Sequence, residues 1–174
     1  MQGSSWMISG AIVVTLATAS IAANPEQVKR LVENLDCEAC NLSEVTLYSY
    51  NLEGANLQGA NLTAAALQGS NLNYAKLSNS MLQKANLGLV KLRQADLQGA
   101  NLQEASLYGA DLAGANLQRA NLQGANLQGA NLQGADLSNT NLQQANLRNA
   151  KMAGANLEGA ILKGAKMPDG REAR

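Results

Sequence analysis

Side chains that could do chemistry are scarce in this chain, and the closest-spaced candidates are Cys37 and Cys40. The 174 residues include two Cys and no His. Without His there is no Ser-His or Cys-His pair for nucleophilic catalysis, and the commonest metal-ligating side chain is missing. The glycines recur at one position of a repeat and do not form a phosphate-binding loop. We therefore expect no catalytic residues, no metal site, no cofactor and no enzymatic activity.

The segment Cys37-Glu38-Ala39-Cys40 has three interpretations. A zinc site needs about four ligands, and the chain has no further Cys or His to supply them. A redox pair is typical of a helix N-terminus, where the dipole lowers the thiol pKa, but this pair follows a predicted helix. We favour a structural disulfide, because the residues before it predict export to an oxidising compartment. Thiol–disulfide exchange is kept as an alternative.

Residues 1–23 are typical of an export signal. No charge occurs from Trp6 to Ala23, and small residues, among them Ser20 and Ala22, follow the apolar stretch. Cleavage fits after Ala22 or after Ala23. The stretch is also long enough for an uncleaved membrane anchor. We predict an exported protein with no membrane association after the signal is removed.

Residues 24–39 predict a short amphipathic helix followed by the Cys pair. Asn24 suits the N-cap, Gln27 could complete a capping box, and Glu26 could pair with Arg30. One apolar stripe is formed by Val28, Leu31, Val32 and Leu35. A helix this short is marginal alone, so we expect its stripe to cap the next element.

Five-residue units, typically Ala-Asn-Leu-Gln-Gly, make up residues 40–169. Every fifth residue from 42 to 167 is apolar, and 24 of these 26 positions are Leu. Two residues before each, 19 of 26 positions are Ala. Neither an α-helix nor a straight strand places every fifth residue on one face. A short extended piece with a bend in each unit does, and it coils the chain into a solenoid with Leu and Ala inside.

The charges indicate how many units form one turn. Residues one turn apart stack about 4.8 Å from each other, where like charges are unfavourable. At a spacing of 20 residues there are three opposite pairs and no like pair: Lys76/Asp96, Lys84/Glu104 and Lys91/Asp111. A spacing of 15 gives four like pairs and two opposite ones. These counts favour four units per turn and about 6.5 coils, a rod roughly 31 Å long.

The units resemble the A(D/N)LXX pattern of the pentapeptide-repeat family over 130 of the 174 residues. This resemblance implies an all-β solenoid, a right-handed quadrilateral β-helix. The order of signal, helix and Cys pair resembles cyanobacterial members of the thylakoid lumen or periplasm, so we expect one of these compartments.

Some members of this family resemble B-DNA and inhibit gyrase-type topoisomerases. A mimic of this length needs on the order of 18 negative charges, but residues 40–169 carry 8 acids and 9 bases. We therefore expect no nucleic-acid binding and a protein-interaction or scaffold role with an unknown partner. Inhibition of a type II topoisomerase is the alternative.

One region departs from the repeat and predicts a small partner patch. Leu89 takes a corner position where Gly or Gln is usual, and Tyr108 follows 19 residues later, diagonally across the next coil. Tyr48 shares the column of Tyr108, and Lys91 and Arg93 add positive charge.

Residues 170–174 form a polar tail that is too short to cover the end of a solenoid. We expect the last coil to be frayed or buried by a partner, which could be a second copy of the chain.

Overall fold

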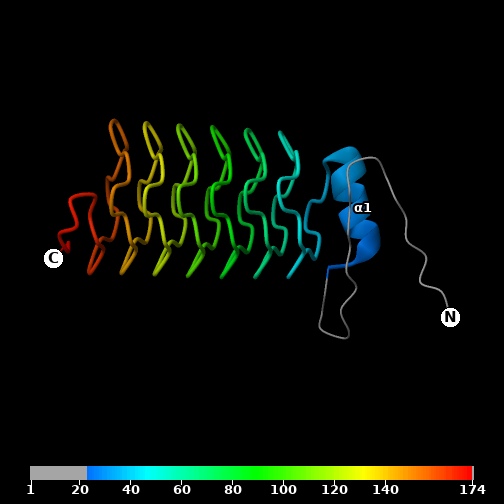
Figure 1. The fold of residues 1–174 in the computed structure, drawn as a ribbon, viewed down its shortest axis with the longest axis horizontal. Coiled ribbons are helices and arrows are strands. Elements are labelled where there is room, and N and C mark those ends of the chain that lie inside the picture. Colours follow the sequence, from blue (N-terminus) through cyan, green and yellow to red (C-terminus); the bar gives the residue numbers. More distant parts are fainter. Residues whose placement is uncertain (1–22, 174) are drawn as a thin grey trace.

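The computed structural model describes residues 23–173, so most of the predicted export signal, residues 1–22, lies outside the described residues. The chain is a stack of coils with one helix, α1 (Pro25–Asn34), at its N-terminal end (Figure 1). The described residues form isolated β-bridges in place of longer strands.

The coils pair in a regular parallel register. Every parallel bridge in the described part of the chain joins residues 20 positions apart, from Asp36 and Asn56 to Asn146 and Lys166. This spacing confirms four units per turn. The ladder begins at Asp36, before the predicted start at residue 40, because Cys37 replaces Leu at the inward centre of one more unit.

Each unit is held by backbone bonds to the coils on both sides. In one unit, the Leu102 N–H donates to Asn121 O of the next coil at 2.7 Å, and the Asn101 N–H donates to Ser80 O of the preceding coil at 2.9 Å. A turn closes where the Ala105 N–H donates to Leu102 O at 3.0 Å. The second residue after each central position from Cys37 to Leu162 has a φ between 53° and 72°. Gly adopts this left-handed conformation without strain, which explains its frequency there.

The core is one continuous apolar column. Every central Leu from Leu42 to Leu147 is at most 1% exposed, and the Ala positions beside them are buried except the one that Tyr50 occupies, which is partly buried. Burial of each Leu stabilises the fold by about 1.5–3 kcal/mol. Three hydroxyl groups inside the column are satisfied by backbone: Ser70 donates to Leu47 O at 2.5 Å, Ser80 to Leu77 O at 2.7 Å and Thr140 to Leu117 O at 2.8 Å.

Helix α1 packs its apolar stripe against this column. Leu31 is fully buried, and Val28, Val32 and Leu35 contact the core. The Asn24 side chain accepts the Glu26 N–H at 3.0 Å, which is the predicted N-cap.

Two predicted contacts of α1 are replaced by contacts to the first coil. The Gln27 side chain accepts the Asn41 N–H at 2.7 Å and does not form a capping box. Arg30 pairs with Asp36, Nη2 to Oδ2 at 2.6 Å, and not with Glu26. Both side chains reach from the helix to the coil beneath it, so the tertiary contact takes precedence over the local one.

The C-terminal tail is paired, which corrects the expectation of a frayed end. A turn at Asp169 and Gly170 reverses the chain, and Lys166 forms an antiparallel bridge with Glu172. The Gly164 N–H donates to Ala173 O at 3.0 Å. The tail does not cover the last apolar layer, whose central residues are only partly buried: Met152, Leu157, Leu162 and Met167.

Candidate functional site

A hollow of about 580 Å³ opens on one wall of the solenoid, around residues 86–89. The polar groups that line it are three amides and a hydroxyl, from Gln68, Asn86, Asn126 and Ser106, and its apolar groups are Leu89 and Tyr108. No lining residue is charged. Leu89 is 64% exposed and Tyr108 is 52% exposed, so the hollow presents both polar and apolar surface.

The hollow exists because a side chain is missing at Gly88. Gln68, Gly88 and Tyr108 occupy the same position in three successive coils, aligned by the bridges of Asn86 with Ala66 and Ser106. Gly88 has no positive φ, and a Cβ built on it would meet nothing closer than the Asn86 Oδ1 at 3.5 Å. Neither backbone conformation nor space therefore requires glycine there.

The next residue, Leu89, is larger than the Gly of the typical unit. Its φ is 56°, the left-handed conformation of the repeat's corners, 12 of which are Gly among the 26 from residue 39 to residue 164. For leucine this conformation costs about 1–2 kcal/mol of free energy. A Cβ on Gly109 would lie 2.8 Å from the Leu89 Cδ2, so the glycine of the next coil makes room for this side chain. Where the typical unit has a large residue followed by Gly, this unit has Gly88 followed by the large Leu89.

The structure brings together two of the five predicted patch residues. The Leu89 N–H donates to Tyr108 O at 2.8 Å, and both side chains line the hollow. Tyr48 is 52% exposed in the same column but lies two coils from Gly88, outside the hollow.

Lys91 and Arg93 lie on the adjoining wall. The Arg93 Nη1 is 3.4 Å from the Asp111 Oδ2, whereas Lys91 has no ion pair among the described residues. At the other corner of the hollow's wall, the Lys84 Nζ is 3.9 Å from the Glu104 Oε2. The uncharged hollow is therefore flanked on both sides by ion pairs, with Lys91, unpaired among the described residues, beside one of them.

The polar lining and Gly88 were not among the residues predicted from the sequence. Reading every twentieth residue gives Tyr48, Gln68, Gly88 and Tyr108 as one column, and the gap at Gly88 is visible in that column. The order Gly88-Leu89, with the small residue before the large one, was the feature of the sequence that could have indicated the hollow.

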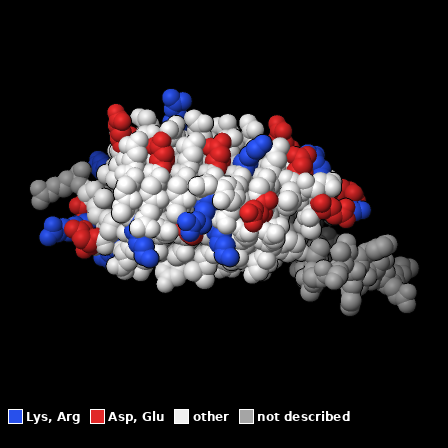
Figure 2. Space-filling model, turned by 90° about the horizontal axis from the view of Figure 1, so that it is seen from above, with Lys and Arg blue, Asp and Glu red and all other residues white. Residues whose placement is uncertain are grey.

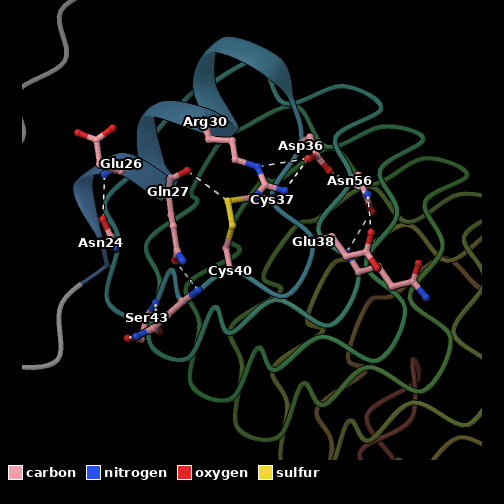
Figure 3. Close-up of a disulfide and its surroundings, with 12 residues drawn as sticks. Asn24, Glu26, Gln27, Arg30, Asp36, Cys37, Glu38, Cys40, Ser43 and Asn56 are labelled. Atoms are coloured by element: carbon pink, nitrogen blue, oxygen red, sulfur yellow. Dashed lines mark hydrogen bonds and ion pairs between the residues drawn. A yellow bond between two sulfur atoms is a disulfide. The ribbon is translucent and has the colours of Figure 1, made fainter.

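The Cys pair forms a disulfide beneath α1 (Figure 3). Cys37 is fully buried and Cys40 is 2% exposed. The Cys37 Sγ lies 3.2 Å from the Gln27 carbonyl oxygen of the helix. The Arg30 guanidinium beside the pair lowers the pKa of Asp36 below its ordinary value of 3.8. Exchange with an external thiol would require α1 to move away, so this geometry favours a structural bond.

Two further kinds of site were sought in residues 23–173. No group of three or more Cys, Asp or Glu there is arranged to hold a metal ion. No helix in the same range is long and apolar enough to cross a membrane.

Charged groups of both signs are interspersed on the visible face in Figure 2, and most of that surface is uncharged. This face has no single-sign field of the kind that recognises a phosphate backbone.

Comparison with protein families supplies the classification. A model described as pentapeptide repeats matches residues 40–79, 60–99, 95–134 and 130–167, with eight copies. The chain belongs to the pentapeptide repeat family. Pentapeptide repeat proteins form right-handed quadrilateral β-helices, in agreement with the 20-residue register. The comparison with curated proteins found no match.

Solved structures of other pentapeptide repeat proteins are similar to this chain. HetL, involved in heterocyst differentiation regulation in the cyanobacterium Nostoc sp. strain PCC 7120, is 43% identical over 79% of this chain and 68% of its own, with a TM-score of 0.36. A protein of the Arabidopsis thaliana thylakoid lumen is 34% identical over 56% of this chain and 65% of its own, with a TM-score of 0.42.

A third solved structure has the same fold at a lower identity. Trypsin-treated QnrB1, a plasmid-mediated fluoroquinolone resistance protein, is 20% identical over 73% of this chain and 62% of its own, with a TM-score of 0.55. At this identity the likeness concerns the fold alone.

Proposed function

We propose that this pentapeptide repeat protein is a non-enzymatic, exported scaffold that binds a partner protein at the hollow around Gly88 and Leu89. The observation that carries the proposal is the pair Gly88-Leu89, in which the small residue precedes the large one. Gly88 leaves open the space that the usual Gln side chain would fill, and Leu89 exposes a branched apolar side chain at a corner where Gly or a polar residue is usual.

The chemistry of the hollow suits a protein segment with a bulky apolar side chain. Exposed Leu89 and Tyr108 would contact that side chain, since tyrosine is enriched at interface centres. The surrounding amides would pair with the backbone of the segment. Acidic residues beside the apolar one would face Lys91, which has no ion pair in the described part of the chain, and Arg93 across the corner.

The rest of the chain would support this docking wall. We propose that α1 caps a solenoid of about 6.5 coils at its N-terminal end. The partly buried layer around Leu157 and Leu162 would be a second contact, through which two copies of the chain could associate.

We propose export to a thylakoid lumen or periplasm. The signal-like residues 1–23 and the disulfide support export, and the lumenal Arabidopsis protein supports the compartment. Topoisomerase inhibition is less favoured, because neutral charge is a poor match to DNA.

The proposal is tested by fractionation of cells and crosslinked capture with the full chain. We expect the protein in an exported fraction, and at least one partner that is lost when Leu89→Ser and Tyr108→Ser are combined. Tyr74→Ser is the matched control, because Tyr74 is 56% exposed away from the hollow. An unchanged set of partners in the double variant would rule out the hollow as the binding site.

A further inference from the structure

Ala23, the first described residue, is already part of the folded body. Its N–H donates to Ser43 O in the first full coil at 3.2 Å, and its methyl group packs against the core. The next residue, Asn24, is the N-cap of α1 and accepts the Glu26 N–H at 3.0 Å. Among residues 23–173, the contacts that hold the N-terminal end therefore include the residue before the helix cap.

We propose that export processing hydrolyses the peptide bond between Ala22 and Ala23, so that Ala23 becomes the first residue of the mature protein. This inference rests on the proposed export. Water supplies the hydroxyl group that joins the Ala22 carbonyl carbon and the hydrogen that joins the Ala23 nitrogen.

Residue size favours this bond over the next one. Signal cleavage sites have small residues at the first and third positions before the cut. A cut after Ala22 places Ala22 and Ser20 at these positions. A cut after Ala23 places the larger Ile21 at the third position.

The contacts of Ala23 in the folded protein also favour the cut after Ala22 over the cut after Ala23. A cut after Ala22 leaves an ammonium group on Ala23, which still donates to Ser43 O, and its charge strengthens that bond. A cut after Ala23 removes this donor and the partly buried methyl group. It also places the new positive charge on Asn24, at the positive end of the α1 dipole.

Two matched variants of the full-length chain test the site in an exporting bacterial host, read by intact mass and N-terminal sequencing. We expect the wild-type protein to begin at position 23. Ala22→Gln enlarges the residue before the cut and should reduce processing at least 10-fold. Ala23→Gln changes the residue after the cut, and its product should still begin at position 23.

The contrary outcomes are distinct. If the wild type begins at Asn24 and Ala23→Gln blocks processing while Ala22→Gln does not, the site is wrong but export processing stands. Cleavage at any other bond also overturns the site. If the wild type and both variants retain residues 1–22, both the site and the proposed signal are wrong.

Discussion

At the scale of single residues, the corner positions show where this chain departs from its own repeat. Asn, Ser, Gln, Lys, Glu, Arg, Tyr and Ala also occupy left-handed corners, each at a conformational cost relative to Gly. Leu89 differs from them because its side chain is apolar, branched and 64% exposed.

Replacement of Leu89 by Gly should separate stability from binding. We expect Leu89→Gly to keep or raise the free energy of unfolding, by up to about 1–2 kcal/mol, because the strain is relieved. Capture of the partner should be lost. Denaturant unfolding and quantitative pull-down measure the two effects. Asn79→Gly, at a corner with a φ of 56° on another wall, should keep the partner. Loss of stability without loss of binding would contradict the role of Leu89.

Asp36 should make stability depend on pH. The hydrogen bond and charge of Arg30 lower its pKa in the folded state, so the stabilising effect is complete above the ordinary value of 3.8 and is lost as pH falls through the lowered value. We expect the thermal midpoint of the wild type to fall over that acidic range. In Asp36→Asn the midpoint should be lower near neutral pH and should fall less on acidification. Parallel curves for the two proteins would show that the ion pair contributes nothing.

At the scale of the elements, the register of the coils followed from the sequence, whereas the docking of α1 did not. A period of five with Leu inside fixes which side chains are buried, because nearly every unit repeats it. The unit at Asp36 was missed since Cys37 replaces Leu. The partners of Gln27 and Arg30 depend on how the helix lies on the first coil, and no local pattern encodes that placement.

The central leucines should contribute unequally to the free energy of unfolding along the rod. Leu97 is fully buried between two coils, while Leu157 belongs to the partly buried last layer. We expect Leu97→Ala to lower the free energy of unfolding by about 2–5 kcal/mol and Leu157→Ala to lower it by less. Chemical denaturation measures both. Equal losses would mean that the last layer is covered in solution, as self-association would predict.

At the scale of the whole molecule, the solenoid is a rod whose visible face is mostly uncharged, with charged groups of both signs spread over it (Figure 2). On such a rod a binding site must arise from local departures. The exposed Leu89 and Tyr108 could be predicted as part of a patch, because each interrupts the pattern by itself. The hollow required the stacking of Gln68, Gly88 and Tyr108, which is visible only once the 20-residue turn is known.

The most direct measurement is site-specific photocrosslinking in cells, with a photoreactive residue in place of Tyr108 or of Ser78. Ser78 follows a central Leu on the opposite wall, two units from the column of Gly88. We predict a protein adduct from position 108 and none from position 78. The adduct at 108 should disappear when Gly88→Gln fills the hollow. Adducts of equal yield from both positions, or an adduct at 108 that persists with Gly88→Gln, would contradict docking at this wall.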